Sequence, residues 1–304
     1  MNKKTFLITG GAGFIGTNLA IHLTEVGHKV VVVDDLSAGD HTARLPEAVD
    51  FHKLDIRDTA GLTRVCAGVD VIVHLAALPR VQFSIEHPLE THDVNINGTL
   101  SVLEAARHAG VPRIVYAASS SAYGDQETLP LSLDLPPQPK SPYALQKFVG
   151  EEMMRTWSVV YGLKTVSLRF FNVYGPHMDP DGAYALVIGR FLKLVKAGQP
   201  LTITGDGQQT RDFTHVKDVI KAIVNAGTLE TVGQGEVFNV GAGVQTSINE
   251  IAKLVGGEVE YVPARLEPKH TMADITQTKA RLQWEPSITV AEGVAELKQE
   301  AGLI

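Results

Sequence analysis

The chain has few of the residues that build disulfide-stapled or metal-clustered proteins. Cys66 is the single cysteine among 304 residues, so an internal disulfide is excluded, as is a zinc site built on several cysteines. The eleven histidines show no metal-ligand spacing with supporting cysteines or carboxylates. We therefore predict no metal site.

Long hydrophobic runs are also lacking. No apolar stretch approaches the roughly 18–20 residues that a membrane-spanning helix needs. The apolar run that begins at Thr5 could pass for a secretory signal, but Gly10, Gly11 and Gly13 interrupt it at once. We expect a cytoplasmic protein with no membrane partner.

Positive charge is in deficit, with 27 Lys and Arg against 34 Asp and Glu, a formal net charge of −7. Nucleic acids and anionic membrane surfaces attract clustered basic residues, so neither is expected as the main partner. Hydrophobic residues make up 44% and charged residues 20%, as in an ordinary globular protein. At about 100–200 residues per domain, the length predicts two domains or one large one.

Short β-branched runs alternate with helical patterns through the first half of the chain. Residues 29–34 are apolar on both faces, as a strand inside a parallel sheet should be. We predict strands at 6–9, 29–34, 69–76 and 113–119, and helices at 14–26, 89–108 and 143–161. This alternation predicts an α/β fold, a Rossmann-like doubly wound parallel sheet with helices on both faces.

The pattern becomes less regular after Gly175. A loop rich in Pro, Asp and Gly at 176–182 precedes a predicted helix at 184–196, a strand at 201–204, a turn at 205–207 and a last helix near 290–301. We expect a smaller C-terminal α/β domain in this region.

A glycine-rich loop lies between the first predicted strand and the first predicted helix. Residues 10–16 read Gly-Gly-Ala-Gly-Phe-Ile-Gly, with glycine at 10, 13 and 16. Glycine lets the backbone turn tightly and approach a pyrophosphate, whose charge the helix N-terminus receives. A plain tight turn is the alternative, but the strand before and the helix after favour a dinucleotide site that includes Phe14 and Ile15.

Asp34 ends the second predicted strand, eighteen residues after Gly16. A carboxylate there accepts hydrogen bonds from the ribose hydroxyls of an adenosine and repels a 2′-phosphate. No Lys or Arg follows at positions 35–37. The cofactor is therefore predicted to be NAD and not NADP.

Tyr143 and Lys147 are four residues apart on a predicted helix that Ser141 can cap and Pro142 can begin. Their side chains share one face, one turn apart. An isolated pair of this kind is usually an ordinary surface pair. A nearby ammonium and a positive nicotinamide ring, however, favour the phenolate and are expected to lower the tyrosine pKa toward that of a base.

Three serines, Ser119, Ser120 and Ser121, stand at the carboxyl end of a predicted parallel strand, where open α/β sheets place their ligands. One of these hydroxyls can hydrogen-bond the substrate hydroxyl that loses its proton. The alternative is a simple turn.

Taken in this order, these motifs resemble the extended short-chain dehydrogenase/reductases, and within them the UDP-glucose 4-epimerase group of nucleotide-sugar enzymes. The resemblance runs essentially end to end. It also includes Asp55-Ile56-Arg57, His74-Leu75-Ala76-Ala77, Asn95-Ile96-Asn97-Gly98-Thr99, Arg169-Phe170-Phe171-Asn172, Arg211-Asp212-Phe213 and Ala273-Asp274.

The resemblance implies roles for individual residues. Ser119 and Tyr143 match the catalytic hydroxyl and the catalytic base, and Lys147 also binds the nicotinamide ribose. The remaining cofactor contacts are Asp55 and Ile56 at adenine, Leu75, Ala76 and Ala77 along the cofactor, and Asn95 near its nicotinamide half. The substrate contacts are Ser121, then Asn172, Arg211 and Arg265 at the diphosphate, and Thr271 beside the sugar's 2-substituent.

The implied activity is an NAD-dependent 4-epimerase that interconverts UDP-glucose and UDP-galactose through a transient 4-keto sugar. Thr271 is smaller than an aromatic residue, so N-acetylated sugars are expected to fit. We assign residues 1–174, with about 212–240 returning, to the NAD-binding domain, and 175–211 and 241–304 to the nucleotide-sugar domain. The helices at 89–108 and 141–161 imply a homodimer; the alternative is a monomer with ordinary amphipathic helices.

Other readings stay open. A dehydratase is disfavoured because Ser120 and Ser121 stand where that group carries Asp-Glu. An epimerase acting on uronates needs an extra contact near sugar carbon 6, which the sequence does not assign. A non-catalytic NAD-binding regulator would not need Ser119, Tyr143 and Lys147 together.

Overall fold

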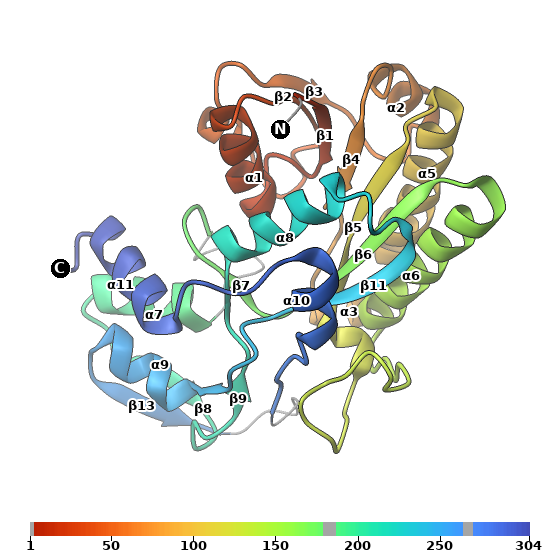
Figure 1. The fold of residues 1–304 in the computed structure, drawn as a ribbon. Coiled ribbons are helices and arrows are strands. Elements are labelled where there is room, and N and C mark those ends of the chain that lie inside the picture. The colour runs from red at the N-terminus through yellow and green to blue at the C-terminus, as the bar shows by residue number, and fades with distance from the viewer. Residues whose placement is uncertain (1–2, 179–186, 264–269) are drawn as a thin grey trace.

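Seven parallel strands form the central sheet of the protein (Figure 1). The computed structural model describes residues 3–178, 187–263 and 270–304. The strands lie in the order β11-β6-β5-β4-β1-β2-β3, so the chain reverses direction across the sheet at β1, and the predicted doubly wound fold is confirmed. Their bounds are β1 Thr5–Thr9, β2 Lys29–Asp34, β3 Asp50–Lys53, β4 Val71–His74, β5 Arg113–Ser119, β6 Lys164–Phe170 and β11 Gln234–Val240.

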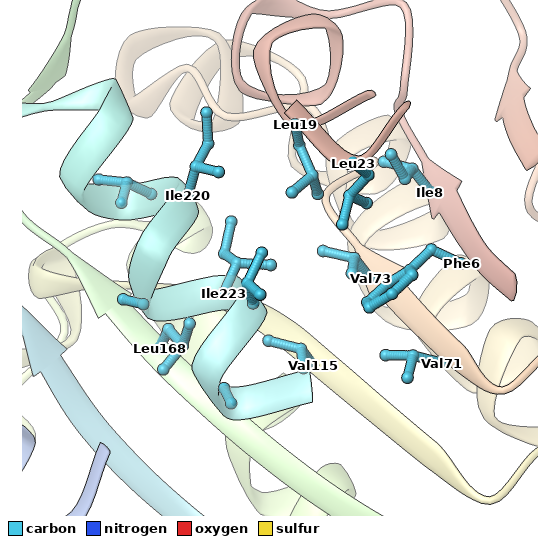
Figure 2. Close-up of a cluster of buried hydrophobic side chains, with 14 of the residues drawn as sticks. Phe6, Ile8, Leu19, Leu23, Val71, Val73, Val115, Leu168, Ile220 and Ile223 are labelled. Carbon is cyan, nitrogen blue, oxygen red and sulfur yellow. The ribbon is translucent and has the colours of Figure 1, made fainter. Parts of the chain in front are cut away.

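Helices cover both faces of this sheet. On one face α1 (Phe14–Glu25) and α8 (Val216–Thr228) pack their apolar side chains onto the strands, as Figure 2 shows for Leu19 and Ile223. On the other face lie α2 (Thr59–Val65), α5 (Gly98–Ala109) and α6 (Pro142–Tyr161). Because both faces are covered, all four central valines of β2 are buried, which explains its continuous apolar run.

A second, smaller hydrophobic core lies in the C-terminal part of the chain. It is built from buried residues of α7 (Val187–Lys196), β8 (Leu201–Thr204), α9 (Ile248–Val255) and α11 (Val290–Glu300), including Phe191 and Ile251. Pairs of short strands surround it: β7 (Val173–Tyr174) with β10 (Thr214–His215), β9 (Thr210–Arg211) with β12 (Thr246–Ser247), and β13 (Val259–Val262) with β8. α10 (Thr276–Leu282) follows as a short helix.

Several elements differ from the sequence prediction. The helix expected at 89–108 is α4 (Pro88–His92), a π-helical turn at Asp93–Asn97 and α5, and the strand expected at 69–76 is shorter. α3 (Val81–Glu86) and the strands β3, β6 and β11 were not predicted; β3 and β11 carry many polar residues, which hides their strand pattern. The helix expected from 184 is described from Val187 onward.

Within the described residues, no helix combines the length and the apolar character needed to cross a membrane.

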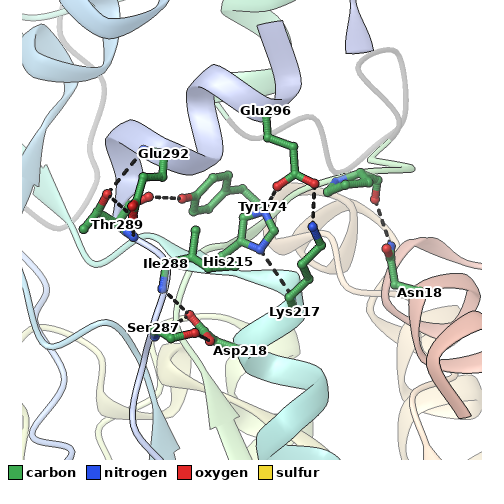
Figure 3. Close-up of polar contacts among 11 residues, drawn as sticks. Asn18, Tyr174, His215, Lys217, Asp218, Ser287, Ile288, Thr289, Glu292 and Glu296 are labelled. Atoms are coloured by element: carbon green, nitrogen blue, oxygen red, sulfur yellow. Dashed lines mark hydrogen bonds and ion pairs between the residues drawn. The ribbon is translucent and has the colours of Figure 1, made fainter. Parts of the chain in front are cut away.

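Asp218 joins the two cores. Its buried carboxylate accepts hydrogen bonds from the backbone N–H groups of Ser287 (2.9 Å) and Ile288 (3.0 Å) and from the Ser287 hydroxyl (2.7 Å) (Figure 3). Its own carbonyl accepts a hydrogen bond from the Trp284 indole N–H. The segment that leads into α11 is thereby fixed onto α8.

Replacing Asp218 with Asn should destabilise the fold by about 1–3 kcal/mol at pH 7, because a neutral amide with one oxygen satisfies fewer of the donors at Ser287 and Ile288 and loses the ion pair with Lys221 (3.1 Å). Burial raises the pKa of this carboxyl, but the bonds from Ser287 and Ile288 outweigh burial and leave the pKa below its ordinary value. The stabilisation is therefore present above about pH 4 and fades as the pH falls through the lowered pKa. Urea unfolding of both proteins at pH 7 and at pH 3 measures the difference, with the exposed Asp134→Asn as the control, expected within about 0.5 kcal/mol of wild type.

Candidate active site

The carboxyl ends of four neighbouring strands bring the predicted cofactor residues together. Gly10 follows β1, Asp34 ends β2, Ala76 follows β4 and Ser119 ends β5. The Gly10 N–H donates to the Val33 carbonyl (2.8 Å), and a Cβ atom on Gly10 would lie 2.7 Å from the Ala76 nitrogen. The first loop therefore lies against the segment that follows β4.

The glycine loop is a cradle that side chains would fill. Gly10 has φ +69°, which favours glycine, and a Cβ atom on Gly16 would collide with the Gly10 carbonyl oxygen. Gly13 stands at the N-cap of α1, so that helix begins directly behind the loop. These features fit the pyrophosphate of a dinucleotide.

The Asp34 carboxylate is held by two backbone groups. Its Oδ2 accepts the Ala12 N–H (3.0 Å) and its Oδ1 accepts the Leu36 N–H (2.9 Å). Burial raises the pKa of this carboxyl, while the two bonds oppose that change. Each oxygen keeps acceptor capacity for a ribose hydroxyl, so the structure fits NAD.

The segment after β4 is fastened to two helices. The Asn95 side chain, on the π-helical turn, accepts the Leu78 N–H (2.7 Å) and donates to the Leu78 carbonyl (3.1 Å). Its amide also donates to Gln146 Oε1 on α6 (2.8 Å). Ala76 and Ala77 are thus held beside α6.

The two residues expected at adenine differ in their surroundings. Both oxygens of Asp55 accept hydrogen bonds from the Arg57 guanidinium, which also contacts Asp93. Ile56 is buried, and its side chain occupies the space that a Cβ atom on Gly98 would need.

The serine, the tyrosine and the lysine of the sequence prediction converge. The Ser141 hydroxyl caps α6 by accepting the Ala144 N–H (3.1 Å), as predicted. Ser119 Oγ accepts both the Ser121 N–H (3.2 Å) and the Ser121 hydroxyl (2.8 Å). The Ser119 hydroxyl proton is then left to face Tyr143, whose raised pKa the Ser119 side chain opposes.

The expected lowering of the Tyr143 pKa does not follow from the protein's own groups. Burial raises this pKa to about 12, although the bond from Ser119 opposes it. Burial also lowers the pKa of Lys147 to about 7, against the opposing charge of Glu151. Lys147 donates to the Ala117 carbonyl (2.7 Å), and its nitrogen lies 4.9 Å from the centre of the Tyr116 ring. Formation of a phenolate therefore depends on further positive charge, such as a nicotinamide ring supplies.

The residues expected to hold substrate gather around β9. Asn172 donates from its amide to the Asp212 carbonyl (3.3 Å), directly beside Arg211. The Thr271 N–H donates to the Thr210 carbonyl (3.2 Å), and the buried Thr271 hydroxyl has no hydrogen-bond partner among the described residues. Arg265 lies outside the described residues.

Sequence reasoning assigned no role to Asp212. Its carboxylate accepts the N–H groups of Ala242 (2.6 Å), Gly243 (3.0 Å) and Ala273 (2.9 Å), although burial raises its pKa to about 6. Three N–H donors aimed at one carboxylate stabilise its charged form. In the sequence, only the position of Asp212 within the Arg211-Asp212-Phe213 motif indicated such a role. Glu151 and Arg169, a buried ion pair behind Lys147, were also missed.

The glycine cradle, the Asp34 carboxylate and the Ser119, Tyr143 and Lys147 side chains meet at one sheet edge, and this arrangement defines the class of nicotinamide-dependent short-chain dehydrogenase-like enzymes. More particularly, the chain belongs to the NAD dependent epimerase/dehydratase family, which it matches over residues 6–241, and its cofactor is NAD.

The relatives are enzymes of nucleotide sugars. The chain is 40% identical over 304 residues to a UDP-glucose 4-epimerase of Mycolicibacterium smegmatis, covering 95% of this chain and 96% of the relative. Its structure matches a UDP-glucose 4-epimerase of Thermotoga maritima with UDP-glucose (TM-score 0.92, 34% identity, 98% of each chain). It also matches a UDP-glucuronic acid 4-epimerase of Bacillus cereus with UDP-glucuronic acid and NAD (TM-score 0.89, 32% identity, 98% of this chain and 99% of the other).

Replacing Asp34 with Asn should weaken NAD binding about tenfold or more, because a charged acceptor of hydrogen bonds becomes neutral. The preference for NAD over NADP should fall as well, since the repulsion of a 2′-phosphate is removed. Isothermal titration of the protein, freed of the NAD that it carries, with each cofactor measures both effects. Asp35→Asn is the matched control, because this exposed neighbour bonds only to Ser37 among the described residues, and equal losses in the two variants would contradict the assignment.

Proposed function

We propose that the protein is an NAD-dependent 4-epimerase that interconverts UDP-glucose and UDP-galactose, and also the corresponding N-acetylated sugars. The observation that carries the proposal is the position of the Tyr143 hydroxyl. It lies near enough to the Ser119 side chain for that group to oppose the rise of the Tyr143 pKa, and Tyr143 stands one helical turn from Lys147 on α6. All three residues stand at the sheet edge where the glycine cradle receives NAD.

In this reaction Tyr143, as phenolate, takes the proton from the hydroxyl on sugar carbon 4, and Ser119 orients that hydroxyl by hydrogen bonding. Bound NAD would supply the acceptor for the hydride of sugar carbon 4 and, once reduced, the donor of that same hydride. The 4-keto sugar turns about its link to the diphosphate and presents its other face, and Tyr143 then returns the proton. Asn172 and Arg211 hold the diphosphate through this rotation; a guanidinium suits phosphate oxygens.

The identity of the sugar rests on two observations. The Thr271 hydroxyl, which has no hydrogen-bond partner in the described ranges, lies in the segment that the family resemblance places beside the sugar's 2-substituent, and a residue of this size leaves room for an N-acetyl group. The structural match to a UDP-glucuronic acid 4-epimerase makes a uronate the second candidate.

Proton NMR of the purified protein with UDP-glucose, UDP-galactose, their N-acetyl counterparts and UDP-glucuronate, without added NAD, tests the proposal. Conversion between sugars that differ only at carbon 4 is expected, with NAD carried by the enzyme. A preference for unacetylated sugars would contradict the role of Thr271. A 6-deoxy-4-keto product would indicate a dehydratase. Conversion of UDP-glucuronate alone would identify a uronate as the substrate, in place of the neutral sugars.

Replacing Tyr143 with Phe should lower kcat by about 10²–10⁴-fold, because the base is lost while the ring still fills its site. NAD content, read from absorbance after denaturation, should stay unchanged. Tyr161→Phe, at the exposed end of the same helix, is the matched control and should retain full turnover. Full turnover in the Tyr143 variant would reject the mechanism, and no turnover in wild type with any UDP-sugar would favour a binding role.

The two hydrophobic cores support two domains with separate binding roles. Residues 1–174 with 212–240 bind NAD, and residues 175–211 with 241–304 bind the nucleotide sugar. β11 returns to the central sheet beside β6. The second core lies largely in the other group of residues.

A homodimer formed through α5 and α6 is also proposed, because large apolar side chains are exposed on these helices. Leu100, Leu145, Val159 and Val160 are between 38% and 78% exposed. Light scattering should give twice the chain mass for wild type, and Leu145→Glu with Val159→Glu should give the monomer mass. Val244→Glu, at an exposed valine elsewhere, should leave the mass unchanged, and a monomeric wild type would reject the dimer.

A further inference from the structure

An ion pair is buried behind the catalytic lysine. Glu151 lies one turn beyond Lys147 on α6 and is 1% exposed, and Arg169 on β6 is 4% exposed. The carboxylate accepts two hydrogen bonds from the guanidinium, at 2.9 Å from Nε and 2.7 Å from Nη2. The guanidinium carbon lies 4.5 Å from the centre of the Tyr123 ring, whose hydroxyl donates to Asn239.

Stability alone does not account for this pair. Removing two charges from water is costly, and apolar residues of similar volume often stabilise a fold equally well. The hydrogen bonding of the buried pair is also incomplete, because Arg169 Nη1 has no hydrogen-bond partner among the described residues. The pair therefore points to an electrostatic role in the site next to it.

The charges that surround Lys147 can be assigned element by element. Its other titratable neighbours are neutral near pH 7: burial lowers the pKa of His74 on β4 to about 3 and raises the pKa values of Tyr116 on β5, Tyr123 on η3 (Ser120–Tyr123) and Tyr143 on α6. Within the described part of the chain this leaves Glu151 and Arg169 packed behind Lys147. Burial raises the pKa of the Glu151 carboxyl, and the two hydrogen bonds from the Arg169 guanidinium oppose that rise and favour the charged carboxylate. Glu151 is the nearer in sequence, on the same helix face.

We propose that Glu151 is a positioning residue whose carboxylate keeps the Lys147 ammonium protonated beside Tyr143, and that Arg169 fixes this carboxylate in place. The inference rests on the proposed function, since a protonated Lys147 matters only if Tyr143 acts as the base. It follows from the geometry, since the Glu151 carboxylate is sealed from water and lies one helical turn from the Lys147 ammonium. Among the described residues this ammonium donates a hydrogen bond to the Ala117 carbonyl. Burial acts in the opposite sense, toward a neutral amine.

The test compares wild type with Glu151→Gln, which removes the charge and keeps the shape. NMR of ¹³C-labelled lysine, with the Lys147 signal assigned through Lys147→Met, measures the midpoint of Lys147 titration without any turnover. The midpoint is expected near pH 7 in wild type and about one unit lower in Glu151→Gln. In the pH profile of kcat/KM, both limbs should move to lower pH, because loss of a negative charge lowers every nearby pKa.

Glu152→Gln is the matched control, because it removes the same charge one residue further along α6, from a half-exposed pair with Arg155. Its midpoint and profile should equal those of wild type. A purely structural role would lower the height of the profile in Glu151→Gln without moving its limbs, and this result would overturn the proposal. A Lys147 midpoint equal in wild type and Glu151→Gln would overturn it too.

Failure of Glu151→Gln to fold and absence of turnover in wild type each leave a decisive measurement. If Glu151→Gln does not fold, the double variant Glu151→Leu with Arg169→Leu replaces the ion pair by apolar side chains. The midpoint of Lys147 titration should still fall in this variant, by less than one unit. An unchanged midpoint would reject the inference. If wild type turns over no UDP-sugar, the proposed function fails, while the NMR titration still decides whether Glu151 controls Lys147.

Discussion

The parallel arrangement of the central strands is the constraint on which the site depends. Because every strand of this sheet runs the same way, the carboxyl ends of β1, β2, β4 and β5 meet at one edge. The chain reverses its path across the sheet at β1, and the loops after β1 and β4 approach so closely that a Cβ atom on Gly10 would strike the Ala76 nitrogen. The glycine loop thereby serves packing, and its shape fits the pyrophosphate of NAD.

Burial at this edge of the sheet opposes the charged forms of both Tyr143 and Lys147. Tyr143 and Lys147 are both desolvated, so the protein alone favours a neutral phenol and moves Lys147 toward a neutral amine. Phenolate chemistry there needs charges that lie close and are sealed from water. The hydroxyl of Ser119 and the positive ring of bound NAD act on Tyr143 directly, whereas the carboxylate of Glu151 acts through Lys147, whose ammonium it keeps charged. A charge-free apolar site of the same shape would pack equally well and leave Tyr143 without basic character.

The second core is fixed to the first by buried carboxylates. Asp218 attaches the segment before α11 to α8, and Asp212 holds three backbone N–H groups around the residues expected at the diphosphate. Each carboxylate gains its partners only in the folded chain. Rigid attachment of this kind suits a mechanism in which the diphosphate stays anchored while the sugar turns.

The sequence by itself determined the doubly wound class, the cradle at 10–16, the acceptor Asp34 and the helix face shared by Tyr143 and Lys147. Each of these follows from local spacing: strand, glycine turn and helix in succession, or two residues one turn apart. It could not supply β3 and β11, whose polar residues hide the strand pattern, or the π-helical turn that directs Asn95 to Leu78. Only the tertiary structure placed Arg169 on Glu151, eighteen residues apart in the chain, and Asp212 on Ala273, because contacts between distant segments depend on packing and leave no periodic trace in the sequence.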